Sequence, residues 1–271
     1  MCAAFVPVSR AISGKLLECA AQPAARTSRC RSTHYVDYKA PAPNERLIFA
    51  MDVPDCDRAR HLAEELGDSV RFYKLGLELM MSGGYFELIE WMLARGKMVF
   101  ADLKFFDIPA TVGAAVRRLK DRGVSFVTVH GNQSIMQAAA ENKGSDLKVL
   151  AVTVLTSLDR GDLDDLGFQC DVESLVLSRA RRAFEVGCDG VISSGLEVSK
   201  LREHVDKRLV VVTPGIRPVE NRPTSDQKRV VSVEDAFANG ADYIVVGRPI
   251  RDAEAPRQAA EAIQNTIKSL F

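Results

Sequence analysis

From residue 47 to the end of the chain, short apolar runs of the kind found in strands alternate with longer segments whose apolar positions recur at helical spacing. This alternation predicts a parallel sheet. Eight repeats within about 225 residues favour a closed (β/α)8 TIM barrel over an open doubly wound sheet. The predicted strands are 47–53, 71–77, 98–104, 126–131, 148–155, 190–194, 208–214 and 243–247, and the predicted helices are 56–66, 85–95, 109–122, 135–142, 172–186, 194–205, 233–239 and 254–269.

The composition fits one catalytic domain with a large core. The chain has 271 residues, of which 46% are hydrophobic and 27% are charged. Lysine plus arginine equals aspartate plus glutamate, at 36 each, so the zero net charge does not favour nucleic acid as a partner. No apolar run approaches the roughly 20 residues that span a bilayer, which argues against a membrane protein.

The six cysteines form no CxxC pair, and half of them lie in the first thirty residues. This usage indicates a reducing compartment and therefore a cytoplasmic protein. Residues 1–45 are rich in alanine, serine and arginine and show no clear period, so we expect a disordered or peripheral extension ahead of a catalytic domain at 46–271. The same composition suits an organelle transit peptide, and targeting remains an alternative.

In barrels of this class the catalytic groups sit at the carboxyl ends of the strands. The densest group of charges at such a position is the segment Asp102-Leu-Lys-Phe-Phe-Asp107, followed by Ile-Pro-Ala-Thr111. Side chains alternate along a strand, so Asp102 and Lys104 should point the same way, and Asp107 should return to their vicinity. An isolated Asp-x-Lys is more often a structural ion pair, but this longer pattern is much less common.

Several motifs along the chain carry a family resemblance. They are FAMDV at 49–53, YKLG at 73–76, DLKFFDIPAT at 102–111, VLTS at 154–157, TPGIRP at 213–218 and VGRPI at 246–250. From residue 47 to the end, the chain resembles the orotidine 5'-phosphate decarboxylase family in its bacterial, monofunctional form. The resemblance implies conversion of orotidine 5'-monophosphate to UMP and CO2, the last step of de novo pyrimidine nucleotide synthesis, without a metal or an organic cofactor.

The resemblance also assigns roles to residues. Lys74, Asp102, Lys104 and Asp107 would form a charged catalytic array in which Lys104 stabilises a carbanion at C6 and protonates it, while Lys74 also contacts ribose. It further implies that Asp107 and Thr111 reach into a neighbouring subunit's site, which would make the protein a homodimer with shared active sites.

The remaining substrate contacts follow from the same match. Asp52 would bind the nucleoside and Thr156 the pyrimidine, and the phosphate would be held by Arg217, Gln227, Gly247 and Arg248. Taken alone, Asp52 reads equally well as a loop or capping carboxylate, and Gly247-Arg248 as a turn with a solvated charge. His130 also ends a predicted strand, but its apolar context favours a core-edge residue over a general base.

Two departures from the commonest bacterial motif are Phe106, where histidine is frequent, and Ala110, where asparagine is frequent. They bear on the dimer contact rather than on the charged array. One alternative is a sugar-phosphate barrel enzyme that uses Mg2+ with the same Asp-x-Lys-x-x-Asp. Such an enzyme is expected to have a metal-binding glutamate on the second strand, where this chain has Lys74. The other alternative is a barrel that has lost its chemistry and only binds a partner.

Overall fold

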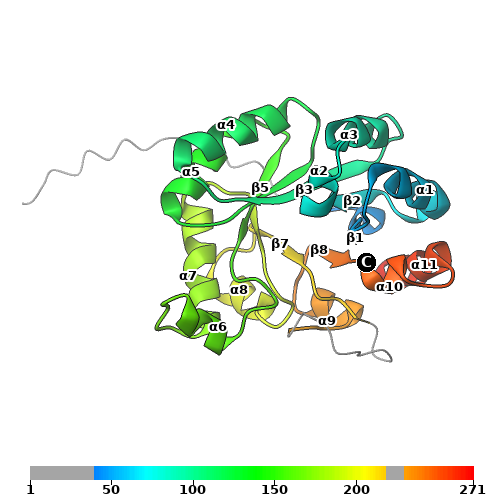
Figure 1. Ribbon diagram of the computed structural model, residues 1–271. Helices are drawn as coiled ribbons and strands as arrows, with labels where there is room; N and C mark the ends of the chain where they lie inside the picture. Colours follow the sequence, from blue (N-terminus) through cyan, green and yellow to red (C-terminus); the bar gives the residue numbers. More distant parts are fainter. Residues whose placement is uncertain (1–39, 218–228) are drawn as a thin grey trace, which may run out of the picture. The chain divides into compact units, whose positions relative to one another are not determined.

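The computed structural model describes residues 40–217 and 229–271, and within them the chain forms a closed barrel of eight parallel strands (Figure 1). Each strand pairs with its neighbours in sequence, and β8 pairs with β1 to close the ring. The strands are β1 (Leu47–Ala50), β2 (Phe72–Leu75), β3 (Met98–Phe105), β4 (Phe126–Val129), β5 (Lys148–Val152), β6 (Gly190–Ile192), β7 (Val210–Thr213) and β8 (Tyr243–Val246).

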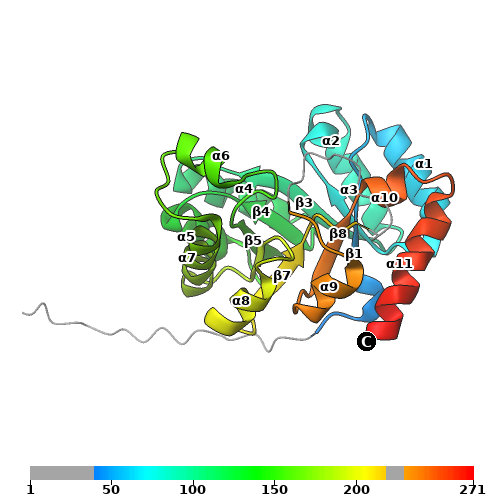
Figure 2. The same ribbon diagram turned by 90° about the horizontal axis from the view of Figure 1, so that it is seen from below.

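Helices follow the strands and cover the outside of the barrel (Figure 2). They are α1 (Cys56–Leu66), α2 (Leu77–Met81), α3 (Tyr85–Leu93), α4 (Pro109–Lys120), α5 (Gln133–Asn142), α6 (Arg160–Asp165), α7 (Val172–Glu185), α8 (Val198–His204), α9 (Val233–Ala238), α10 (Arg248–Arg251) and α11 (Pro256–Leu270), with 3-10 turns η1 (Pro43–Glu45) and η2 (Gly67–Ser69). Helix α11 lies beside α1 and so completes the ring next to the closing strand (Figures 1 and 2).

Local sequence fixes where several helices begin. Asp55, Asp171 and Ser232 precede α1, α7 and α9, and each side chain accepts a hydrogen bond from a backbone N–H in the first turn. Pro109 begins α4, where its missing N–H leaves no intrahelical bond unmade. These signals are local, which is why the sequence locates these helix starts within a residue or two.

The predicted (β/α)8 barrel is confirmed. Most predicted strands run one to three residues too far at their carboxyl ends: the first was expected to reach residue 53 and ends at Ala50. Asp52, two residues after the end of β1, lines a cavity at this end of the barrel. The sequence analysis also missed α2, α6 and α10, which have only four to six residues each and are too short to show a helical period.

Apolar side chains fill the amino-terminal half of the barrel interior. Phe72, Phe100, Phe126 and Tyr243 meet there edge to face, with ring centroids 4.9 Å apart for Phe72 and Phe126 and 5.1 Å apart for Phe126 and Tyr243. A second and larger core lies between strands and helices. Because the inner core closes the barrel from below, open space remains only toward the carboxyl ends of the strands.

Within the described parts of the chain, no helix combines the length and apolar character needed to cross a bilayer. The predicted extension at 1–45 falls outside the described residues up to position 39, so its boundary and the cytoplasmic location stay predictions.

Candidate active site

A cavity of about 460 Å³ opens at the carboxyl ends of the strands. Eight of the eleven residues predicted from the sequence lie in its wall, and they come from six different strands or the loops that follow them. They are Asp52, Lys74, Asp102, Lys104, Thr156, Arg217, Gly247 and Arg248. The volume falls in the range of small-molecule sites.

Lys74, Asp102 and Lys104 form a compact charged array on one side of this cavity. The Lys104 Nζ lies 2.8 Å from Asp102 Oδ2, and the Lys74 Nζ lies 3.4 Å from the same oxygen. Lys74 also donates to Asp52 Oδ1 at 3.0 Å. Asp52 after β1, Lys74 on β2, and Asp102 and Lys104 on β3 therefore alternate in sign. The Lys104 side chain, 34% exposed, is the more open of the two lysines.

Lys74 and Asp102 keep their charges at neutral pH. Burial alone would lower the pKa of Lys74, but the carboxylates of Asp102 and Asp52 outweigh it and hold that pKa above its ordinary value. Burial would raise the pKa of Asp102, and the two ammonium groups, with donated hydrogen bonds, bring it below its ordinary value instead. A protonated lysine and an ionised aspartate thus sustain each other in a water-poor site.

Another part of the cavity wall is built from the loops after β7 and β8. Arg217 and Gly215 follow β7, and Gly247 and Arg248 follow β8. Gly215 has a φ of 80°, which favours glycine. A Cβ on Gly247 would lie 3.3 Å from the Cβ of Ala50, so glycine keeps this wall open. Two guanidinium groups beside exposed backbone suit a phosphate.

Asp107 does not join the array within a single chain. Strand β3 runs on to Phe105, and the segment after it continues outward over the rim, so Asp107 is exposed and its carboxylate accepts from the N–H of Ile108 at 2.6 Å. Thr111, on the first turn of α4, is exposed as well, and neither residue lines the cavity. Gln227 lies outside the described residues.

Comparisons with known proteins agree with this geometry. Residues 45–263 match the model of the Orotidine 5'-phosphate decarboxylase / HUMPS family. The chain belongs to this family.

Among its relatives, orotidine 5'-phosphate decarboxylase of Methylococcus capsulatus is 67% identical over 227 residues, which cover 84% of this chain and 93% of the relative. The decarboxylase of Nitrobacter winogradskyi is 50% identical over 81% of this chain and 91% of its own length. The crystal structure of the Lactobacillus acidophilus decarboxylase superposes with a TM-score of 0.73 at 34% identity, covering 84% of this chain and 99% of that one. The predicted bacterial-type decarboxylase family is confirmed.

One residue at the array was not predicted from the sequence, Thr128 on β4. Its side chain is fully buried, and its hydroxyl donates to Asp102 Oδ1 at 2.8 Å. The sequence interpretation considered only His130 in this strand, because it ends the run Val127-Thr128-Val129-His130. His130 is half-buried, does not line the cavity, and has a pKa lowered by burial, by Arg179 and by Lys104. Period-two alternation along β4 places Thr128 on the same face as Phe126, toward the barrel interior, but no pattern in the sequence indicates which residues of β3 it meets.

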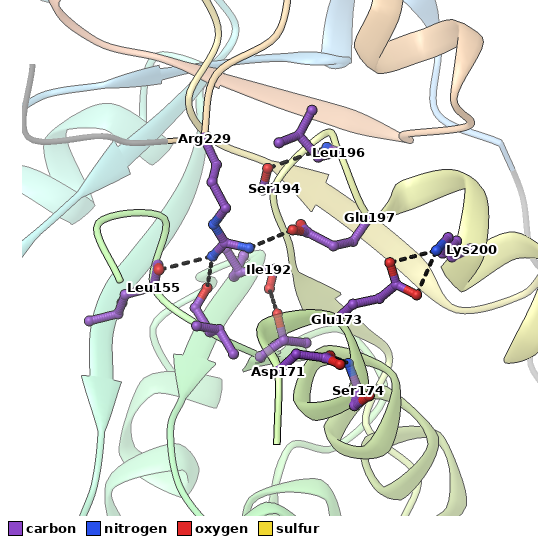
Figure 3. A network of polar contacts seen from close by, with 12 residues as sticks. Leu155, Asp171, Glu173, Ser174, Ile192, Ser194, Leu196, Glu197, Lys200 and Arg229 are labelled. Carbon is purple, nitrogen blue, oxygen red and sulfur yellow. Dashed lines mark hydrogen bonds and ion pairs between the residues drawn. The ribbon is translucent and has the colours of Figure 1, made fainter. Parts of the chain in front are cut away.

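A second feature that the sequence did not reveal is a buried ion pair behind the cavity wall (Figure 3). Arg229 donates to Glu197 Oε1 at 2.6 Å and to the carbonyl oxygens of Val154 and Leu155 at 3.2 and 2.9 Å. It therefore ties the loop after β6 to the loop after β5, which carries Thr156. Nothing in the spacing of Arg229 and Glu197 along the chain signals this contact.

Among the described residues, no three histidine, cysteine, aspartate or glutamate side chains gather as a metal ion would require. In the cavity wall, the carboxylates of Asp52 and Asp102 both face the ammonium of Lys74. This ammonium fills the position between the acids where a divalent cation would otherwise balance them. The predicted absence of a metal and of an organic cofactor stays a prediction.

Proposed function

We propose that this protein decarboxylates orotidine 5'-monophosphate to UMP and CO2 in de novo pyrimidine nucleotide synthesis, using its own side chains in place of a metal or organic cofactor. The observation that carries the proposal is the array of Lys74, Asp102 and Lys104, which faces Arg217 and Arg248 across one cavity. Membership of the family and the decarboxylases among its relatives support the reaction.

The chemistry requires a fixed cation at C6 of the pyrimidine. When the bond from C6 to the carboxylate breaks, CO2 leaves and the electron pair stays in an orbital in the plane of the ring, where the ring cannot delocalise it. The Lys104 ammonium stabilises this charge and then transfers a proton to C6, which yields UMP and a neutral lysine that solvent reprotonates. A preorganised ammonium in a site of low dielectric stabilises such a charge far better than water does.

Asp102 takes the place beside the departing carboxylate. Because its pKa is held low, it stays ionised and holds the Lys104 ammonium in place through their hydrogen bond. A second carboxylate near it, that of the substrate, raises the energy of the bound ground state, and this repulsion disappears as CO2 forms. Lys74 holds Asp102 and Asp52 together and, with Asp52, reaches the ribose.

The phosphate lies at the other end of the same cavity. Arg248, Gly247 and Arg217 bind it, with Gln227, which lies outside the described residues, as a further contact. Thr156 in the loop after β5 contacts the pyrimidine. Binding energy from the phosphate, remote from C6, then holds the ring against Lys104 and lowers the barrier to the chemical step.

Two copies of the chain complete the site. Asp107 and Thr111 are exposed, and Phe106 and Ile108 beside Asp107 are 70% and 66% exposed. Large apolar side chains at that exposure favour an interface, and a second copy that covers them would take Asp107 and Thr111 into its own cavity. The protein is therefore a homodimer in which each site contains four charged residues of the array, one of them from the partner.

The test uses the purified full chain with orotidine 5'-monophosphate in excess EDTA, followed by the loss of the orotate absorbance. We expect full turnover, because Lys74 and Lys104 supply the positive charge. Activity that disappears with EDTA and returns with Mg2+ would favour the metal-dependent sugar-phosphate chemistry instead. Binding of the nucleotide without any turnover would identify a non-catalytic barrel.

A further inference from the structure

The ladder between β3 and β4 is irregular at the array. Ala101 pairs with Val127 and Phe105 pairs with Val129, so three residues of β3 face one residue of β4, Thr128. Such a bulge bends its strand and changes where its side chains point. Within this bulge Lys104 has a φ of 46°, and it is the one non-glycine residue with a positive φ in the described part of the chain. A lysine in this conformation is strained and needs support from its surroundings.

The hydroxyl of Thr128 supplies that support at the gap in the ladder. It accepts a hydrogen bond from the backbone N–H of Lys104 at 3.0 Å and donates one to Asp102 Oδ1 at 2.8 Å. The other oxygen of Asp102 accepts from Lys104 Nζ. Backbone, hydroxyl, carboxylate and ammonium thus form a closed ring of three hydrogen bonds, which fixes both the direction of Lys104 and the tilt of Asp102.

We infer that Thr128 is a positioning residue for the decarboxylation, which holds Lys104 and Asp102 in their reactive arrangement through its one hydroxyl. The inference rests on the proposed function. Only a group that accepts and donates at once closes the ring, so serine can replace threonine and valine, which has the same shape, cannot.

The hydroxyl also affects the charge state of Asp102. The groups that face this carboxylate are Lys74 from β2, Lys104 from β3 and Thr128 from β4, with the Tyr85 phenol of α3 nearby and Asp52 beyond Lys74. Loss of the donated hydrogen bond removes one of the influences that lower the pKa of Asp102, so the pKa rises. Protonation of Asp102 then begins at a higher pH, and the acidic limb of the rate profile moves upward with it.

The experiment compares Thr128→Val with Thr128→Ser. We expect Thr128→Val to lower kcat by about 10- to 100-fold with a smaller change in KM, and to shift the acidic limb of kcat/KM upward. Thr128→Ser should stay within about threefold of the unchanged protein and keep its pH profile, since it retains the ring of hydrogen bonds. The 13C signal of the Asp102 carboxyl, followed against pH, gives the same comparison without turnover.

A matched control is Thr213→Val, because Thr213 ends β7, is fully buried and has no hydrogen-bond partner for its hydroxyl among the residues that the structure describes. It should change neither kcat nor the pH profile. If Thr128→Val does not fold, Thr128→Cys, a weak donor of similar size, takes its place. An active parent with unchanged kcat and pH profile in Thr128→Val overturns the inference, as does equal impairment of the valine and serine variants. An inactive parent overturns the proposed function, and the Asp102 titration still decides the role of Thr128.

Discussion

The two rims of the barrel contain similar charged side chains in different arrangements. At the amino ends of the strands, Asp242 accepts from the backbone N–H of Val211 at 2.7 Å and from Arg202 Nη2 at 2.6 Å. Asp189 repeats the pattern with a strand N–H and the ammonium of Lys143. Each of these carboxylates joins a strand N–H to a cationic side chain.

At the carboxyl ends the cations and the acids are shared. Asp102 faces two ammonium groups, Lys74 and Lys104, and Lys74 is divided between Asp102 and Asp52. The Asp102 oxygens accept hydrogen bonds from the side chains of Lys104 and Thr128, and the Lys104 side chain lines the cavity. The difference shows that residue type alone does not tell a structural carboxylate from one that serves a ligand site. What differs is the surroundings of the carboxylate, which are a strand N–H at the amino rim and a ligand cavity at the carboxyl rim.

The largest expected effect comes from removing Lys104. Lys104→Ala should reduce turnover of orotidine 5'-monophosphate by at least about 1,000-fold, because it removes both the charge that stabilises the carbanion and the proton donor. The unfolding midpoint should stay the same or rise, since Asp102 keeps Lys74 as a partner. Turnover is measured by orotate absorbance and stability by thermal unfolding.

Lys97, immediately before the amino end of β3, offers the matched control. Its ammonium donates to the carbonyl oxygens of Gly67 and Val70 at 2.6 and 3.1 Å. Lys97→Ala should lower the unfolding midpoint and leave kcat unchanged. Substantial decarboxylation by Lys104→Ala, or loss of kcat in Lys97→Ala, would contradict the division between the rims.

The second prediction concerns the ion pair of Asp242 and Arg202 at the amino ends of the strands. Asp242→Asn should lower the free energy of unfolding by about 3 kcal/mol, because Arg202 is left with a buried charge that the amide does not balance. The kcat of the folded fraction should be that of the unchanged protein. Urea unfolding gives the first quantity and active-site titration the second. A fall in kcat with unchanged stability would mean that this ion pair acts on the site.

The sequence predicted the residues at the mouth of the barrel better than the residues that hold them in place. Lys74, Asp102 and Arg248 could be found because each follows an apolar run, and strand ends share one rim whatever the details of packing. Thr128 and Arg229 could not be found in this way. Thr128 matters because a bulge sets it opposite Lys104, and Arg229 because two loops fold back toward it, and neither event leaves a period in the chain. Asp107 shows a third limit, since its place in the site depends on the second chain of the proposed dimer.

A smaller effect concerns the phosphate side of the mouth. Arg248→Ala should weaken nucleotide binding by about 10- to 100-fold, as expected for the loss of a charged hydrogen bond, and should lower turnover to a lesser extent. Orotidine, which has no phosphate, is the discriminating substrate: its slow decarboxylation should be the same in both proteins. An unchanged KM for the nucleotide, or an equal loss with orotidine, would show that the phosphate binds elsewhere.

The smallest effect tests the amino rim where it is most open to water. Asp206 accepts from Arg208 Nε and Nη2 at 2.9 and 2.7 Å and from the Arg208 N–H, and these contacts lower its pKa to about 2. Since the unfolded value is higher, the stabilisation is present above about pH 4 and is lost as the pH falls through the folded value. Asp206→Asn should therefore cost less than about 1 kcal/mol at pH 7, because Arg208 is half-exposed, and the difference should shrink between pH 4 and pH 2. Urea unfolding of both proteins across this range measures it, and a difference that grows toward low pH would assign the pair an unfavourable role.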